Sequence, residues 1–361
     1  MAVPLFDTTT PLASLHAEID AAIAGVVASR KFILGPQVGA FEAEFAAFCG
    51  TRHAVGVANG TDAITIALRA MGVGPGDDVV VPSFTFYATA EAVPPTGARP
   101  VFCDVDPDTY CVTAETVAAA MTPATKAVVA VHLFGNLAPV ADIEALGVPV
   151  LEDAAQAAGT RSAAGRPGAL GRAGTFSFFP SKNLGCYGDG GAITTGDDAL
   201  AEAARMLRFH GSHDKVTYEH VGYNSRLDEL QAAILRVQLP LVDDWAAGRR
   251  AAARHYEDAG LGELVSLPAA TAGCEPAWHL YVVRSDRADE LAAGLGARGI
   301  GAKAYYRVPV HRQPAMRAIA GAVSLPVTDD LAATHLAIPM SPVLTAEQAA
   351  EVTAAVRAVL A

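Results

Sequence analysis

Lys182 is the residue whose position in this sequence best suits covalent chemistry. It follows an aromatic, strand-like segment, Thr175–Phe179, and precedes the glycine-rich stretch 185–191. Ligands bind open α/β sheets at the carboxyl ends of the strands. A lysine there is partly withdrawn from water, which lowers the pKa of its amine and favours the neutral form that can make a Schiff base with a carbonyl group. A lone lysine at such a position is more often an ordinary surface-loop residue, so its neighbours must decide.

Three further residues supply the groups that a pyridine cofactor requires. Asp153 ends another apolar segment and is expected at the same sheet edge as Lys182. In pyridoxal phosphate (PLP) chemistry, a carboxylate beside the pyridine nitrogen keeps that nitrogen protonated, so that the ring accepts electrons. Gln156 is placed to bind the phenolic oxygen, and Phe86, in a helix expected over Thr85–Val93, to stack on the ring. Asp153 also suits a helix N-cap, and Phe86 an ordinary core position.

The segment 59–62 lies between an expected strand and an expected helix, where a phosphate group would find free donors. Backbone N–H groups and the helix dipole make such a helix start an anion site. Gly60, Thr61 and Asp62 provide these groups, and Ser177 adds a hydroxyl from the strand before Lys182. An ordinary N-cap would give the same pattern, so this segment alone does not decide the function.

Apolar segments alternate with helical patterns through the first two thirds of the chain. Continuous apolar runs such as Val79–Pro82 and Ala127–Leu133 are typical of strands buried on both faces. This pattern predicts an α/β fold with a large, mainly parallel sheet and helices on both faces. The last third begins with a long helix over Trp245–Leu261 and continues with mixed elements, which predicts a smaller C-terminal α+β domain. We expect a large domain over 1–240 and a small one over 241–361.

Composition excludes several classes of function. The formal net charge is −12, so the chain lacks the excess of basic residues that is typical of nucleic-acid or membrane-surface binding. The N-terminal residues do not form a signal peptide, and the apolar run 127–134 is too short to span a bilayer. Five scattered cysteines suggest free thiols in a reducing compartment, and the histidines show no metal-ligand spacing. We therefore expect a soluble, cytoplasmic protein without a metal.

The chain resembles the sugar aminotransferases of the DegT/DnrJ/EryC1/StrS family over essentially its whole length. The motifs that carry the resemblance are Gly60-Thr-Asp-Ala63, Pro82-Ser-Phe-Thr-Phe86, Glu152-Asp-Ala-Ala-Gln156, Ser177-Phe-Phe-Pro-Ser-Lys182, Gly222-Tyr-Asn-Ser-Arg226 and His311-Arg-Gln-Pro314. Because these motifs are independent and occur in order, the resemblance is specific. It implies the fold-type-I architecture of PLP enzymes.

The resemblance also implies a role for each matching residue. Lys182 would hold PLP as a Schiff base, Asp153 would face the pyridine nitrogen, and Gln156 the phenolic oxygen. The remaining cofactor contacts would be Phe86 on the ring and, at the phosphate, Gly60, Thr61, Asp62, Ser177 and Asn224. Asn224 would come from the neighbouring subunit of a homodimer with shared active sites. Tyr306 and His311 would lie beside the acceptor substrate.

The activity implied by the resemblance is amino-group transfer from L-glutamate to a nucleotide-linked keto-6-deoxyhexose. The sugar would be linked to dTDP and aminated at C3, and the cofactor would pass through pyridoxamine phosphate. The product would enter amino-sugar and antibiotic biosynthesis. The stretch His210–Lys215 resembles enzymes that act at a 3-keto position. Amination at C4 or of a keto-cyclitol stays open. A sugar dehydratase, in which histidine commonly replaces the lysine, and a non-enzymatic regulator fit less well because Lys182 and Asp153 are both retained.

Overall fold

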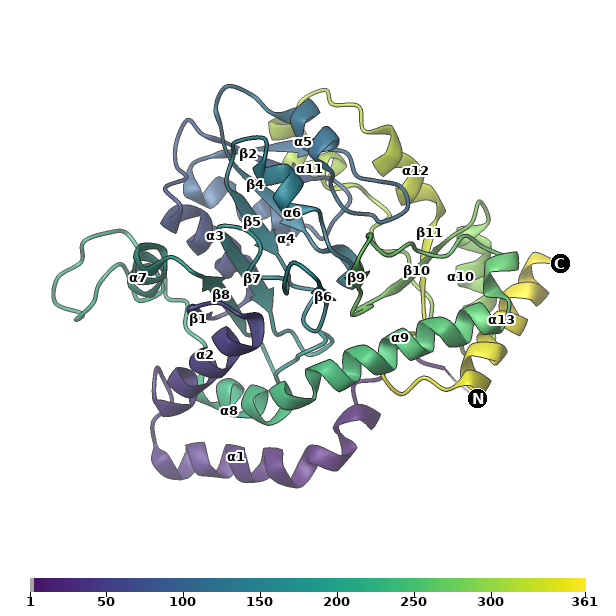
Figure 1. The fold of residues 1–361 in the computed structure, drawn as a ribbon, viewed down its shortest axis with the longest axis horizontal. Helices are drawn as coiled ribbons and strands as arrows, with labels where there is room; N and C mark the ends of the chain where they lie inside the picture. Colours follow the sequence, from purple (N-terminus) through teal and green to yellow (C-terminus); the bar gives the residue numbers. More distant parts are fainter. Residues whose placement is uncertain (1–2) are drawn as a thin grey trace.

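A seven-stranded sheet forms the centre of the larger part of the molecule (Figure 1). The computed structural model describes residues 3–361. The strand order is β1-β8-β7-β5-β4-β2-β3, and only β8 runs antiparallel to its neighbours. The strands are β1 (His53–Val57), β2 (Asp78–Pro82), β3 (Arg99–Cys103), β4 (Thr125–Val131), β5 (Val150–Asp153), β7 (Ala173–Ser177) and β8 (Gly191–Thr195). The mainly parallel sheet predicted from the sequence is confirmed.

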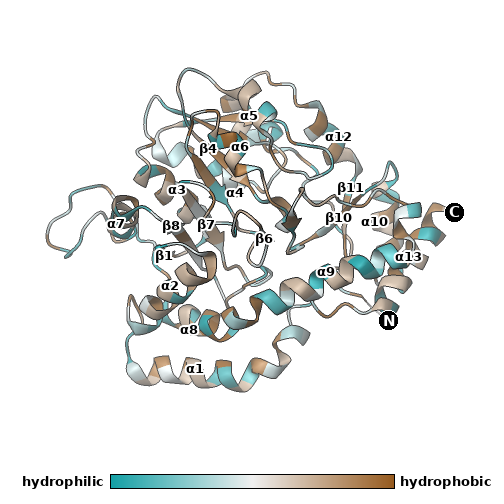
Figure 2. Cartoon of the chain, in the orientation of Figure 1, coloured by the Kyte–Doolittle hydropathy of each residue, from teal (hydrophilic) through white to brown (hydrophobic). Residues whose placement is uncertain are grey.

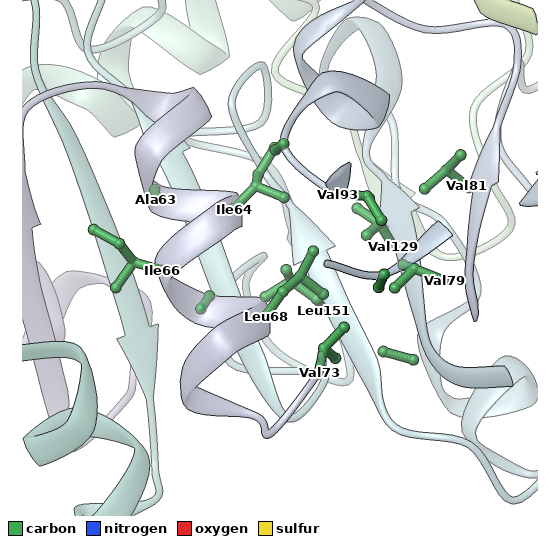
Figure 3. Packing of buried hydrophobic residues seen from close by; sticks show 14 of the residues in the cluster. Ala63, Ile64, Ile66, Leu68, Val73, Val79, Val81, Val93, Val129 and Leu151 are labelled. Atoms are coloured by element: carbon green, nitrogen blue, oxygen red, sulfur yellow. The ribbon is translucent and has the colours of Figure 1, made fainter. Parts of the chain in front are cut away.

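Apolar residues cover both faces of this sheet, which explains the continuous apolar runs in its strands. Along β2, Val79 and Val81 point into one core cluster and Val80 into the other. Val129 and Leu151 share the first cluster with the apolar side of α3, as Figure 3 shows. Alternate side chains of a strand point to opposite faces, so each face needs its own apolar cover.

Helices before residue 241 supply that cover, except α1, which packs on α8. They are α1 (His16–Ser29), α2 (Pro36–Cys49), α3 (Gly60–Ala70), α4 (Ala88–Glu91), α5 (Ala114–Ala120), α6 (Val140–Glu144), α7 (Asp198–Leu207) and α8 (Glu229–Gln238). The helix expected over Thr85–Val93 is wrong in extent, because only α4 is helical there. Phe86 therefore lies in the loop before a short helix and does not open a long one. Short 3-10 turns cover Thr10–Leu15, Pro94–Thr96, Leu133–Gly135, Leu239–Leu241, Leu261–Glu263 and Val310–Arg312.

The C-terminal third has a core of its own, built on the long helix α9 (Figure 1). Tyr256 of α9 and Leu336 of β11 belong to that core. Figure 2 shows hydrophilic residues along α9 and mostly hydrophobic ones in the central strands. The elements are α9 (Val242–Asp258), β10 (Tyr281–Arg284), α10 (Ala288–Gly296), α11 (Pro314–Ala320), α12 (Pro326–Thr334), β11 (His335–Ile338) and α13 (Ala346–Leu360), with β10 antiparallel to β11. Two-residue strands, β6 (Arg161–Ser162) and β9 (Cys274–Glu275), pair across the two parts.

The segment before α12 returns to the large sheet. Val310, Met316 and Leu325 pack in the same cluster as Val79 and Val81. The division proposed at residue 240 therefore does not separate the two hydrophobic cores completely. This segment follows residue 240 in the chain, but its side chains belong to the core of the large domain.

Helix α1 lies at the edge of the molecule (Figure 1). Within residues 3–361, Thr10–Ser29 is the one helical stretch long and apolar enough to cross a membrane by length and composition. Its Leu15 and Ile19 pack on Ile234 of α8, whereas Val27 is 55% exposed. A single such helix near the N-terminus is weak evidence for a membrane span. Its contacts with α8 show that it packs against the rest of the protein.

Candidate active site

One cavity of about 410 Å³ gathers most of the residues expected to bind the cofactor. It lies where β4, β5 and β7 end, at Val131, Asp153 and Ser177. The expected residues in its wall are Gly60, Thr61, Phe86, Asp153, Gln156, Ser177, Lys182 and Tyr306. Parallel strands bring their carboxyl ends to one edge, and the chain reverses direction there in loops that carry these side chains.

Asp153 is the buried carboxylate of this cavity. It is 5% exposed, and its Oδ2 accepts a hydrogen bond from Thr89 Oγ1 at 2.8 Å. Its Oδ1 accepts one from the backbone N–H of Ala155 at 3.2 Å. Burial raises the pKa of Asp153, while these hydrogen bonds and the charge of Lys182 oppose that shift. A buried carboxylate needs a cationic partner, and a protonated pyridine nitrogen supplies one.

Lys182 lies half-buried in the same wall, five residues after the end of β7. Burial lowers the pKa of Lys182 to about 8, although the charge of Asp153 opposes the shift. At neutral pH the neutral amine is then about 300 times more abundant than in an ordinary lysine of pKa ~10.4. The side chain is thus prepared for the nucleophilic chemistry expected from the sequence.

The start of α3 forms the end of the cavity that suits a phosphate. Asn59 caps the helix, and its Oδ1 accepts a hydrogen bond from the N–H of Asp62 at 2.8 Å. That N–H is therefore occupied, and Asp62 does not line the cavity, whereas Gly60 and Thr61 do. A Cβ at Gly60 would lie 2.8 Å from Cβ of Ser177, so only glycine lets the helix start approach β7 so closely.

The aromatic side of the cavity is built from two distant segments. Phe86 is 54% exposed, and its ring centre lies 5.9 Å from that of Tyr306. Gln156 holds Tyr306 in place, because its Nε2 donates to the tyrosine hydroxyl at 3.1 Å and its Oε1 accepts from the N–H of Phe134 at 2.7 Å. An uncovered aromatic face beside a buried carboxylate suits a flat ring.

His279 is a residue of the wall that sequence reasoning missed. Its Nδ1 lies 3.2 Å from Oδ1 of Asn183, whose Nδ2 donates to the carbonyls of Ala158 and Ala277. Oδ1 of Asn183 is therefore the acceptor, and Nδ1 of His279 carries the proton. Burial and the charge of Lys182 lower the pKa of His279, so the ring is neutral. In the sequence, Trp278-His279 resembles ordinary core and gives no signal of a site.

Besides Asp62, two expected site residues do not line this cavity. His311 is buried against Ser83, with 2.6 Å between its Nδ1 and Oγ of Ser83, and its backbone N–H donates to the same oxygen. Its expected contact with the acceptor is not supported by this position. Asn224 pairs through its backbone with Phe209 in the loop between α7 and α8, outside the cavity of a single chain. A role in a neighbouring subunit stays a prediction.

The residues of the wall fit PLP. They provide a lysine amine, a buried carboxylate, an uncovered aromatic face and a helix start that approaches β7 through a glycine. These four features lie on one cavity.

Residues 13–357 match the model of the DegT/DnrJ/EryC1/StrS aminotransferase family. The chain belongs to this family. It is 47% identical to the dTDP-3-amino-3,4,6-trideoxy-alpha-D-glucose transaminase of Streptomyces venezuelae, over 98% of this chain and 95% of the relative. It is 44% identical to a pleiotropic regulatory protein of Geobacillus stearothermophilus, over 96% of both chains.

Solved structures agree with this assignment. The crystal structure of S. venezuelae DesV in complex with a ketimine intermediate superposes with a TM-score of 0.95, at 46% identity, over 99% of this chain and 98% of DesV. The chain is therefore a PLP-dependent aminotransferase of the fold-type-I architecture.

Proposed function

We propose that this enzyme transfers the amino group of L-glutamate to the C3 carbonyl of a dTDP-linked keto-6-deoxyhexose, in amino-sugar biosynthesis. The observation that carries the proposal is the cavity in which Lys182, with its lowered pKa, faces the buried Asp153. The choice of sugar is supported by the 47% identity to a relative named for a dTDP-3-amino sugar.

Each residue of the cavity then has a task. PLP, when bound, supplies the electron-withdrawing ring that stabilises negative charge at the carbon that loses its proton. Asp153 keeps its charge beside the ring nitrogen. Lys182, as a neutral amine, would accept the proton from the α-carbon of glutamate and, as the resulting ammonium, would give that proton back as a general acid. Gln156 and Tyr306 hold the wall on which the ring and the acceptor lie.

A panel of acceptors tests the proposal. The enzyme is incubated with L-glutamate and, separately, a dTDP-3-keto sugar, a dTDP-4-keto sugar and an inosose, with Lys182→Ala as the inactive control. We expect the 3-keto sugar to gain one amino group at C3, detected by mass spectrometry and located by NMR. Preferred amination of the 4-keto sugar or of the inosose would replace the proposal with one of those two activities.

We further propose a cytoplasmic homodimer in which Asn224 reaches the phosphate of the neighbouring subunit. The loop between α7 and α8 projects from the body of the chain (Figure 1), and its Val216 and Val221 are 80% and 83% exposed. Apolar side chains at the tip of a projecting loop suit burial against a second copy.

Mixed dimers test the shared site. Lys182→Ala and Asn224→Ala are each inactive or strongly impaired in this proposal, but a heterodimer of the two has one site with both native residues. Random exchange makes about half of the dimers hetero, so about a quarter of the wild-type activity should return. No recovery after exchange verified by mass spectrometry would contradict the shared site.

A further inference from the structure

A second cavity, of about 190 Å³, adjoins the cofactor cavity at Lys182. Phe6, Ser181 and Lys182 line both cavities. The rest of the second wall comes from the N-terminal segment, from the loop 180–187 after β7, from the end of α8 with Gln238, from α9 with Trp245 and Arg249, and from Pro342. The second cavity is therefore distinct from the cofactor cavity but borders the same catalytic side chain, Lys182.

Arg249 is a buried guanidinium without an anionic partner in this wall. It is 7% exposed, and its one hydrogen bond in the described chain runs from Nη1 to the carbonyl of Trp278 at 3.2 Å. Its Nε has no hydrogen-bond partner among residues 3–361. Burial lowers the pKa of Arg249 to about 10, and no carboxylate offsets that shift. Buried charges are ordinarily paired, so an isolated guanidinium calls for an anion.

The surroundings of Arg249 reinforce this need. Gln238 is 2% exposed, and its Nε2 donates to no atom of the described residues. Lys182 adds a second cationic group to the same wall. The one carboxylate there, Asp7, is engaged elsewhere, because its Oδ1 accepts the N–H groups of Thr9 and Thr10 at 3.0 and 2.8 Å.

We propose that this cavity binds a small anion, a carboxylate or a halide, on the guanidinium of Arg249 and the side-chain amide of Gln238. The anion satisfies donors that the protein itself leaves open. Its charge also lies beside Lys182 and stabilises the ammonium form of that lysine. The site thereby couples the concentration of a small anion to the protonation of the catalytic amine.

Thermal unfolding of the holoenzyme tests the site. Sodium acetate and sodium chloride are titrated separately, with ionic strength held constant by a bulky aromatic disulfonate that exceeds the cavity. We expect a saturable rise of about 2 °C in Tm, because a ligand that binds only the folded state stabilises it. A rise with acetate alone identifies a carboxylate site, and a rise with chloride identifies a halide site. No rise with either salt overturns the proposal.

Two variants on α9 locate the effect. Arg249→Met keeps the length of the side chain and removes its charge, so the anion-dependent rise should disappear. Arg250→Met removes the neighbouring charge, which pairs with Glu275 at 3.4 Å at the surface, and should keep the full rise. If Arg249→Met does not fold, Gln238→Leu provides the same test and should weaken the apparent anion affinity severalfold. An unchanged rise in Arg249→Met or Gln238→Leu would contradict the assignment.

Discussion

The two cavities that meet at Lys182 differ in how their polar groups are satisfied. In the cofactor cavity, Asp153 accepts two hydrogen bonds and Gln156 uses both ends of its amide. In the second cavity, Arg249 makes one hydrogen bond within the part of the chain that the structure describes, and the amide nitrogen of Gln238 makes none there. Where every polar group has a hydrogen-bond partner, the side chains are fixed before the ligand arrives. Where donors lack partners, a bound ligand supplies them. Lys182 belongs to both, so its protonation reports on both.

The largest change should come from removing the buried charge of the cofactor cavity. Asp153→Asn keeps the shape of the side chain, and its amide can still hydrogen-bond with the Thr89 hydroxyl, but it cannot hold a negative charge beside the ring nitrogen. We expect turnover to fall roughly 10²- to 10³-fold, measured as 2-oxoglutarate release, with the cofactor still attached. Asp243→Asn, which breaks a surface pair with Arg166, is the matched control and should stay near wild type. Near-normal turnover of Asp153→Asn would disprove its role.

The pH dependence of cofactor attachment should respond to groups in both cavities, because Lys182 lines both. With a pKa of about 8, Lys182 is increasingly neutral as the pH rises toward 8. The rate at which the apoenzyme reacts with PLP should therefore fall about tenfold per pH unit below the midpoint. Stopped-flow absorbance measures this rate. A bound anion in the second cavity favours the ammonium form and should move the midpoint upward in the wild type but not in Arg249→Met. A midpoint near that of free lysine would show that burial does not act on Lys182.

A smaller effect is expected from the aromatic wall. Tyr306→Phe removes the hydroxyl that accepts the hydrogen bond of Gln156 Nε2 at 3.1 Å. The ring stays, so the loss is one partly buried hydrogen bond, about 1 kcal/mol, or roughly fivefold. Single-turnover absorbance should show this loss mainly in the half-reaction with the keto sugar. Equal loss in the half-reaction with glutamate would mean that Tyr306 supports the cofactor and does not select the acceptor.

His311→Ala should leave catalysis nearly unchanged, because His311 lies outside both cavities. The substitution removes the imidazole partner of the buried Ser83 hydroxyl but keeps the backbone N–H that donates to it, so the free energy of unfolding should fall by about 1 kcal/mol. Urea unfolding measures the stability, and steady-state kinetics the activity. A severalfold rise in KM for the keto sugar with unchanged stability would restore the contact with the acceptor that the motif suggests.

The sequence was sufficient where sheet topology alone places a residue. Lys182, Asp153 and Ser177 follow or end strands, and parallel strands must bring such ends together. Gly60 was predictable for the same reason, as the first residue of the helix after β1. The main parallel sheet and the separate C-terminal elements followed from periodicity, although β11 was too short to be recognised.

What the sequence could not give depends on contacts between distant segments. His279 meets Asn183 across 96 positions, and Thr89 meets Asp153 across 64. The Arg/Ala-rich helix α9 did not distinguish the buried Arg249 from Arg250, which binds Glu275 at the surface. His311 matches the family motif in type and order, but a motif does not give the direction in which a loop turns a residue, so its contact with the acceptor stays a prediction.

Mapping the site of cofactor attachment tests the central claim most directly. The holoenzyme is reduced with borohydride, digested and analysed by mass spectrometry, with a sample first converted by excess L-glutamate as the control. The cavity predicts one pyridoxyl-labelled peptide, modified at Lys182, and loss of that label after glutamate treatment. A label at Lys126, Lys215 or Lys303, or no covalent label at all, would contradict the assignment of Lys182.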